Sequence, residues 1–225
     1  MAGSKSETRS GNWEGTVLLL SGGSHMGKSF FAKTVLATEY NAVYRQIDNV
    51  YTAAVNDARM VGPSGSEELA DEEKRNAERD ARRRARDRNW PSDTVKADFF
   101  ASYKKQIRQA CREAFAKKAP MVLEGGSLRN KEEVEIAARY AREIYGADAR
   151  VIRITVEVPY DRWLQNRVNR MLRSGVKTTQ LSKLSLETYT AEAKAATPKP
   201  NREVVDHKVH DVDEVRRLMS DLDRR

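Results

Sequence analysis

Short apolar runs alternate along the chain with longer segments in which apolar residues recur every three or four positions. The short runs predict strands over residues 16–21, 42–48, 121–124, 151–158 and 204–209. The amphipathic segments predict helices over residues 30–38, 49–59, 98–118, 131–145, 160–172, 183–196 and 212–222, and Asp211 is expected to cap the last one. Because continuous apolar strands alternate with helices, the sequence predicts an α/β fold with a parallel sheet covered on both faces.

A glycine-rich segment follows the first predicted strand. Residues 22–29 read Gly-Gly-Ser-His-Met-Gly-Lys-Ser and fit G-x-x-x-x-G-K-[ST], the phosphate-binding P-loop. A strand precedes this segment and a helix follows it, which is the context that the motif requires. A chance match in a glycine-rich turn is the alternative. The pattern favours a P-loop fold that binds a nucleoside triphosphate.

The motif assigns roles to its own residues. Its glycines admit backbone conformations that a Cβ forbids, so successive N–H groups can point at phosphate oxygens. Lys28 is expected to reach the β- and γ-phosphates, and the Ser29 hydroxyl to help hold Mg²⁺. ATP is the expected nucleotide, because no Asn-Lys-x-Asp guanine motif is present. The predicted cofactor-binding residues are Gly22, Gly23, Ser24, His25, Met26, Gly27, Lys28 and Ser29.

Two carboxylates end predicted strands, at the edge of a parallel sheet where ligands bind. Asp48 is the expected general base toward an attacking hydroxyl, and a helix N-cap is a compatible alternative. Glu124 is expected to act on Mg²⁺ through water or to orient the acceptor, because an acid without a role would be costly to bury there. Together with Gly22, these residues are expected to converge on one crevice.

Arginines supply candidate phosphate contacts. Arg129 follows Gly125-Gly126-Ser127 and is either an acceptor-phosphate ligand or a surface residue. Arg167 and Arg170, on the predicted helix that also carries Arg162 and ends near Arg173, are expected to clamp the moving phosphoryl group. A solvated helix face is the alternative.

Charge is unevenly distributed along the chain. The formal net charge is +8, from 41 basic and 33 acidic residues, which favours DNA or another polyanion as partner, although a generic basic surface fits equally. Residues 67–88 are almost wholly charged, and residues 79–88 hold six arginines and two aspartates. We interpret this stretch as a solvated helix with internal ion pairs, and a phosphate-touching arm is the alternative.

The predicted organisation is a disordered leader, residues 1–12, and one domain, residues 13–225, with an insertion at 60–95 and a lid region at 160–196.

The single cysteine, Cys111, excludes an intrachain disulfide and fits a reducing cytoplasm. We expect it half-buried on a helix. The longest apolar run is about five residues, so no membrane span is expected. The sequence makes no prediction of the oligomeric state.

Taken together, the Gly22–Ser29 loop, Asp48, Glu124-Gly125-Gly126 and Asn166-Arg167-x-x-Arg170 resemble the P-loop kinases of the polynucleotide kinase type. The resemblance covers about residues 16–196 without 60–95. It implies that Asp48 is the general base toward a 5′-hydroxyl. It also implies that an arginine-rich lid helix, residues 165–170, closes over ATP together with a second helix that includes residues 184–189.

The chain departs from the family pattern at two places. Tyr51 stands where the pattern often has an arginine for the acceptor's phosphate, and Glu124 with two glycines replaces an aspartate followed by threonine and asparagine. Bacteriophage kinases that phosphorylate 5-hydroxymethyluracil in DNA belong to the same broad group and need a basic surface. For a bacteriophage protein, the expected localisation is the host cytoplasm. The expected function is transfer of the γ-phosphate of ATP to a hydroxyl of DNA or a nucleotide, on that base or at a 5′ end.

Two other functions fit the same motif. A small-molecule kinase would phosphorylate a sugar, nucleoside or antibiotic, and DNA would not compete with its acceptor. A nucleotide-dependent switch would hydrolyse or sense ATP without any hydroxyl acceptor.

Overall fold

The computed structural model describes residues 13–60, 71–129, 131–173, 185–198, 201–202 and 204–224. The expected leader, residues 1–12, and the Gly-Pro break near residue 63 lie outside these residues. The chain divides into two compact units. One unit joins Met1–Tyr44 to Cys111–Arg225, and the other is Arg45–Ala110.

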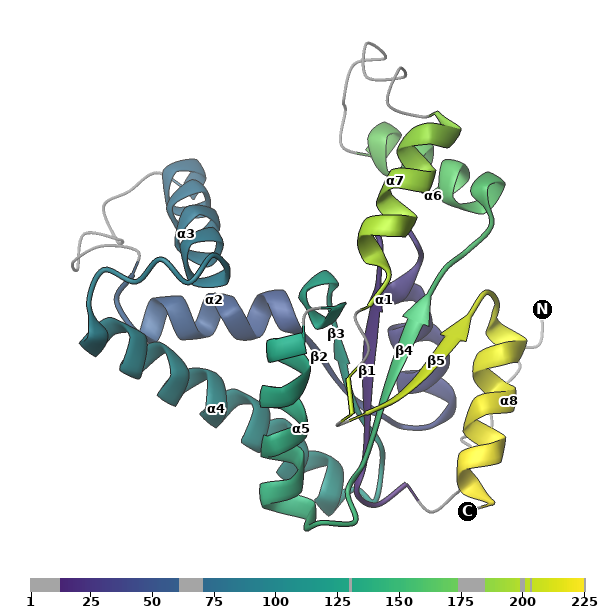
Figure 1. Cartoon of the computed structure of the whole chain (residues 1–225), viewed down its shortest axis with the longest axis horizontal. Helices are drawn as coiled ribbons and strands as arrows, with labels where there is room; N and C mark the ends of the chain where they lie inside the picture. The colour runs from purple at the N-terminus through teal and green to yellow at the C-terminus, as the bar shows by residue number, and fades with distance from the viewer. Residues whose placement is uncertain are drawn as a thin grey trace. The chain divides into compact units, whose positions relative to one another are not determined.

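A five-stranded parallel sheet organises the first unit (Figure 1). Its strand order is β2-β3-β1-β4-β5. The central strand pairs with β3 on one side and β4 on the other, and every one of its residues is buried. The predicted α/β fold is therefore confirmed. The strands are β1 (Thr16–Gly22), β2 (Val43–Gln46), β3 (Met121–Glu124), β4 (Arg150–Val156) and β5 (Val205–Val209).

Helices cover both faces of this sheet. The π-helix η1 (Phe31–Ala37) and α8 (Val212–Asp223) share one apolar cluster with alternate residues of the strands. Side chains on a strand alternate between its two faces, so the remaining strand residues point to the other side. There α5 (Lys131–Tyr145) contacts β1 and buries Val134, Ala137, Ala138 and Ala141. The first cluster includes Leu18, Leu20, Ile152, Ile154, Val35, Leu36, Val215 and Met219.

Several local predictions match the structure closely. The predicted strand 121–124 and helix 131–145 agree residue for residue. Asp211 caps α8 as expected, because its side chain accepts a hydrogen bond from Glu214 N at 2.8 Å.

Two further helices, α6 (Tyr160–Arg173) and α7 (Leu186–Ala196), lie beyond the carboxyl end of β4 (Figure 1). None of the helices in the described ranges is long and apolar enough to cross a bilayer.

The helix after the glycine-rich loop departs from a regular α-helix. A short α1 (Lys28–Phe30) passes directly into the π-helix η1, and Thr38 Oγ1 donates to Lys33 O at 2.9 Å near its end. The sequence predicts a helix here but not its geometry. Because π-turns are uncommon and occur often at functional sites, this segment draws attention to the loop that precedes it.

The second unit is helical. It contains α2 (Ile47–Asp57), α3 (Asp71–Arg86) and most of α4 (Asp93–Ala116). Tyr51, Phe99 and Tyr103 form an aromatic cluster, with ring centroids 5.3–5.9 Å apart. The charged helix α3 contacts α2 and buries Ala81 and Ala85 completely. Its charged side chains include an exposed Arg83–Asp80 ion pair at 3.3 Å, as a solvated helix predicts.

The boundary after β2 corrects one prediction. β2 ends at Gln46, so Asp48 lies in the first turn of α2 and does not end a strand. The N-cap position belongs to Gln46, so the capping alternative for Asp48 is also wrong. The helix begins early because it buries Ile47 completely, and a carboxylate in a first turn is favoured by the helix dipole.

Cys111 is fully buried, more deeply than predicted. Its Sγ donates to Met121 Sδ at 3.2 Å, and burial raises the pKa of the thiol to about 12. A thiol with so high a pKa is a poor nucleophile, in agreement with a structural role.

Gly22 provides a direct test of how β1 packs against β4. Its φ is 140°, and an added Cβ would lie 2.5 Å from Val156 O. We expect Gly22→Ala to lower the free energy of unfolding by about 2–4 kcal/mol through backbone strain and steric overlap. Gly126→Ala is the matched control, because a Cβ there meets nothing within 4 Å, and we expect a change below about 0.5 kcal/mol. Urea unfolding followed by circular dichroism measures both variants, and equal midpoints would contradict the close approach.

Candidate functional site

The loop between β1 and α1 presents a row of backbone donors. Gly27 and His25 have φ angles of 84° and 62°, and the N–H groups of Phe30 and Phe31 donate to Gly27 O at 2.9 and 3.1 Å. Within the described residues, the backbone N–H groups of Ser24, His25, Met26 and Gly27 donate to no backbone carbonyl. Such a run of uncommitted donors at the start of a helix is suited to binding phosphate oxygens.

The side chain of Lys28 contacts the backbone of this loop. Its Nζ donates to Gly23 O at 2.7 Å, so the ammonium lies against the turn that carries the N–H groups. The next residue, Ser29, is exposed. The loop therefore combines backbone donors, a cation and an accessible hydroxyl, as the motif predicts.

Glu124 ends β3, the strand that pairs with β1, and β1 leads into this loop. In the register of β1 with β3 it is the partner of Leu20, so its side chain points to the same face of the sheet as Leu20, the face that η1 covers. It is only 3% exposed, and Tyr44 Oη donates to its Oε2 at 3.0 Å. Burial, together with Glu124, raises the pKa of Tyr44 far above its ordinary value, so Tyr44 stays a donor at neutral pH.

Sequence reasoning missed Tyr44. It lies 80 positions before Glu124, and no local pattern connects the two residues. The only available signal is its place on the predicted second strand, which ends near the other candidate carboxylate.

Both helices of the predicted lid region contact the loop. On α6, Asn166 Nδ2 donates to His25 O at 3.0 Å, and on α7, Glu192 O lies 3.4 Å from where a Cβ on Gly23 would be. The predicted clamp residue Arg167 donates from Nη1 to Glu192 Oε1 at 2.9 Å. Glu192 is a functional candidate that the sequence did not reveal, because no periodicity connects it to a residue 25 positions away on another helix.

The pKa of His25 reflects the charges that surround the loop. Its pKa is lowered, first by burial and then by the positive charges of Arg170 and Arg167. Lys28 adds to this effect, whereas the carboxylate of Glu192 opposes it. The structure thus brings three predicted cations of the site close to one loop residue, although Arg170 itself is exposed.

The other arginines named in the sequence analysis have no hydrogen bond or ion pair with the loop among the described residues. Arg129 ends the short helix η3 (Gly126–Arg129), and its side chain is not among the parts that the structure describes. Arg162 is exposed and donates to Gln165 Oε1 at 3.4 Å. Arg173 is also exposed, at the end of α6.

Asp48 belongs to the second unit, where it has an arginine partner. Its Oδ1 accepts from Arg86 Nη2 of the charged helix α3, and 45% of the Asp48 side chain is exposed. The Arg86 guanidinium also lies 5.6 Å from the centroid of the Tyr51 ring. Asp48 is therefore accessible to a reactant while a cation orients it, an arrangement that the sequence does not show.

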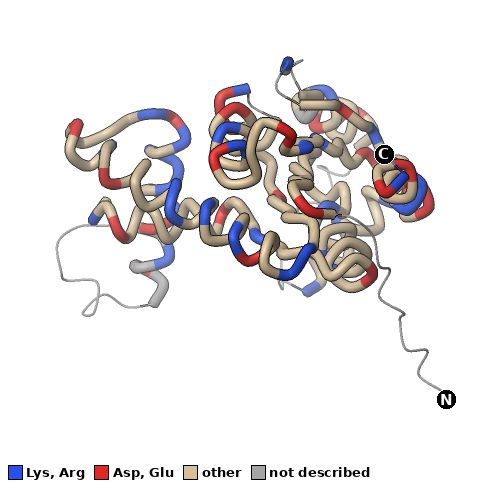
Figure 2. The backbone as a smooth tube through the Cα atoms, turned by 90° about the horizontal axis from the view of Figure 1, so that it is seen from below, with Lys and Arg blue, Asp and Glu red and all other residues tan. Residues whose placement is uncertain are grey.

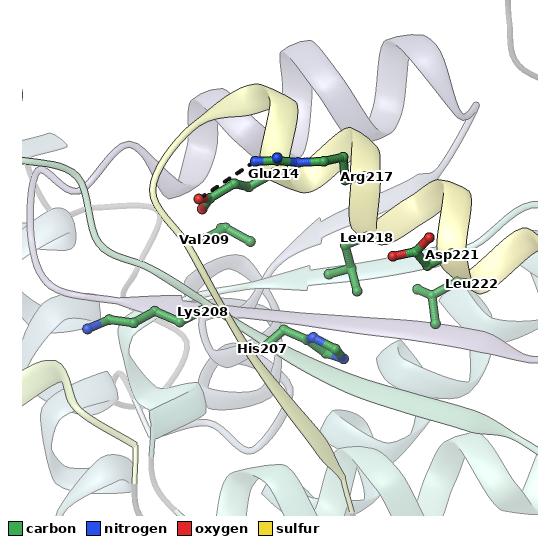
Figure 3. A pocket seen from close by; sticks show the side chains of 8 residues that line it. All are labelled: His207, Lys208, Val209, Glu214, Arg217, Leu218, Asp221 and Leu222. Atoms are coloured by element: carbon green, nitrogen blue, oxygen red, sulfur yellow. Dashed lines mark ion pairs between the residues drawn. The ribbon is translucent and has the colours of Figure 1, made fainter.

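A separate groove of about 340 Å³ lies between β5 and α8 (Figure 3). Glu214 and Arg217 form an ion pair across one helical turn at its rim, at 3.9 Å. The groove contains no residue of the predicted site. Its lining residues are His207, Lys208, Val209, Glu214, Arg217, Leu218, Asp221 and Leu222.

Three solved structures resemble the chain distantly. A candidate kinase from Chloroflexus aurantiacus is 9% identical, with 92% of this chain and 97% of that chain covered and a TM-score of 0.47. A sugar kinase from Janibacter, solved without ligand, is 13% identical, with 92% and 94% covered and a TM-score of 0.44. An uncharacterized protein from Eubacterium ventriosum is 15% identical, with 93% and 99% covered and a TM-score of 0.44. No protein-family model and no curated protein sequence matches the chain, so any assignment of activity depends on the site itself.

The charges around His25 predict opposite pKa changes for two variants. Glu192→Gln removes a charge that raises the pKa of His25, so the pKa should fall further. Arg170→Met removes a charge that lowers it, so the pKa should rise. Arg162→Met, on the same helix as Arg170, is the control and should leave it unchanged. A proton NMR titration of the imidazole measures all three, and equal shifts for the two arginine variants would show that Arg170 does not lie near the loop.

Proposed function

We propose that this chain is an ATP- and Mg²⁺-dependent phosphotransferase that transfers the γ-phosphate to a hydroxyl acceptor. The observation that supports this most strongly is the row of N–H groups from Ser24 to Gly27, which donate to no backbone carbonyl in the described part of the chain, together with Lys28 beside them. Phosphoryl transfer needs little covalent chemistry from a protein. Positioned donors and cations that neutralise developing charge account for most of the catalysis.

The residues around the loop fit this chemistry. Lys28 would neutralise the β- and γ-phosphate oxygens, and Arg167 and Arg170 would stabilise charge on the transferring group. The exposed hydroxyl of Ser29 and the buried carboxylate of Glu124 are oxygen ligands of the kind that Mg²⁺ prefers, directly or through water. The ion would supply charge neutralisation of the triphosphate when bound.

Asp48 is the proposed general base. It follows β2 by two residues, about twenty positions after Lys28, and its half-exposed carboxylate can accept the proton of an attacking hydroxyl. The ion pair with Arg86 would hold one carboxylate oxygen and leave the other for the acceptor. Arg129 remains a candidate ligand for a phosphate group of the acceptor.

For the acceptor we propose DNA or a nucleotide, phosphorylated on a 5-hydroxymethyluracil base or at a 5′ end. The supporting observations are the net charge of +8 and the six arginines of residues 79–88. One observation favours a small-molecule acceptor instead. Acidic positions occur among the basic ones along much of the backbone (Figure 2).

An acceptor assay with ATP labelled at the γ-phosphate separates these functions. The acceptors are duplex DNA with 5′-hydroxyl ends, end-blocked duplex DNA with internal 5-hydroxymethyluracil, and a mixture of nucleosides and sugars. We expect label on one of the DNAs, with a transfer rate that falls steeply as salt rises. Label on small molecules alone would identify the second candidate. Release of free phosphate with no labelled acceptor would contradict a kinase.

The base assignment predicts a specific loss. Asp48→Asn should reduce transfer by about 10²–10⁴-fold, because it removes general-base assistance, while ATP binding is retained. Asp93→Asn is the control, since Asp93 is also an exposed acid in the first turn of a helix of the second unit. Steady-state rates and equilibrium binding measure the two effects. Transfer at the wild-type rate in Asp48→Asn would reject Asp48 as the base.

A further inference from the structure

Glu192 is an acidic residue that forms an ion pair with the predicted clamp residue Arg167, and the proposed function gives it no role. We propose that Glu192 is a positioning residue of the nucleotide site, which holds the Arg167 guanidinium until a phosphate group of the nucleotide takes its place. This proposal rests on the proposed function, because it needs a polyphosphate at the loop.

Both carboxylate oxygens of Glu192 are engaged. Oε1 accepts from Arg167 Nη1 at 2.9 Å, and Oε2 accepts from Trp163 Nε1 at 3.1 Å. The Arg167 guanidinium also lies 5.0 Å from the centroid of the Trp163 ring. Arg167 thus has a defined position, set by a carboxylate and an aromatic face on two different helices.

This cluster is built into the structure and is not a surface ion pair. Trp163 is fully buried, and the side chains of Arg167 and Glu192 are 15% and 28% exposed. Long side chains held in one geometry at partial burial lose their freedom before any ligand arrives. Arg167 is therefore already ordered when a ligand reaches the loop, which lowers the entropic cost of a new contact.

The cluster lies against the loop. The backbone carbonyl of Glu192 is close to Gly23, and Asn166, the neighbour of Arg167 in sequence, donates to His25 O. The charges of both Arg167 and Glu192 act on His25. A phosphate bound by the loop amides would thus lie near an arginine whose present partner is a carboxylate.

Exchange of the two anions is chemically simple. A guanidinium binds a carboxylate and a phosphate with the same planar fork, so Arg167 can transfer from one to the other without a new donor geometry. A triphosphate with its higher charge competes well, but it must displace Glu192, and this lowers its net affinity. Glu192 therefore sets how readily Arg167 becomes available to the nucleotide.

Removal of the negative charge provides the test. Glu192→Gln keeps an oxygen that can accept from Trp163 Nε1 but no longer holds the guanidinium by charge. We expect it to bind a non-hydrolysable ATP analogue with an imido-linked γ-phosphate about tenfold more tightly than the wild type, a change of the size of one charge-assisted hydrogen bond. The gain in affinity should disappear in the double variant: Glu192→Gln added to Arg167→Met should bind the analogue no more tightly than Arg167→Met alone, because no guanidinium remains to be released.

Two controls separate this role from a structural one. Glu187→Gln removes an exposed acid from the first turn of the same helix and should leave the affinity unchanged. Glu192→Asp keeps the charge and should restore an affinity close to that of the wild type. Isothermal titration measures the affinities in the full-length chain.

A spectroscopic signature tests the same exchange without a charge variant. Because Trp163 contacts both partners of the ion pair, its fluorescence should change when the analogue binds to the wild-type chain, and this change should be absent in Trp163→Phe. The signal from Trp13 and Trp90 persists in that variant and serves as the reference.

The outcomes distinguish the two proposals. Analogue binding by the wild type with no gain in Glu192→Gln and no fluorescence change from Trp163 would overturn the role of Glu192 and leave the proposed function intact. No analogue binding by the wild type would overturn both. Tighter binding that persists in the double variant would show that Glu192 repels the nucleotide directly and does not act through Arg167.

Discussion

The central strand β1 is the element on which the arrangement of the first unit depends. It lies between β3 and β4 with every residue buried, and Gly22 at its carboxyl end is so close to Val156 O that no side chain fits there. The glycine-rich loop leaves the sheet at this point, where β1 ends. The register of β1 with β3 pairs Leu20 with Glu124 and so fixes the position of Glu124. Helix α7 also contacts β1. A donor loop, a buried carboxylate and helix α7 thus all depend on β1.

Charge partners explain why the basic composition says less about function than it first suggests. Arg153 is completely buried and donates twice to Asp206, at 2.6 and 2.8 Å. Arg216 donates to both oxygens of Glu39, and Arg86 to Asp48. Many arginines thus stabilise contacts within the chain, so a positive net charge does not by itself define a nucleic-acid surface. The cations that matter for the proposed chemistry are those around His25.

The sequence predicts what is encoded locally. Apolar runs predict the strands, glycines with Lys28 and Ser29 predict the loop, and Asp211 predicts a helix start, because each depends on neighbours within one turn or strand. The strand-end position of Asp48 is wrong because burial of Ile47 decides where α2 begins, and that depends on tertiary packing. The contacts of Tyr44 with Glu124 and of Arg167 with Glu192 join residues far apart in sequence, so periodicity contains no trace of them.

Binding of the phosphates of ATP by the amides of residues 24–27 can be tested by backbone amide NMR of the labelled chain, titrated with Mg²⁺ and a non-hydrolysable ATP analogue. We expect the largest shifts on Ser24, His25, Met26 and Gly27, and we expect these shifts to be lost in Lys28→Met. Shifts centred instead on the groove between β5 and α8, at His207 and Arg217, would contradict it, as would identical titrations of the wild type and the Lys28 variant.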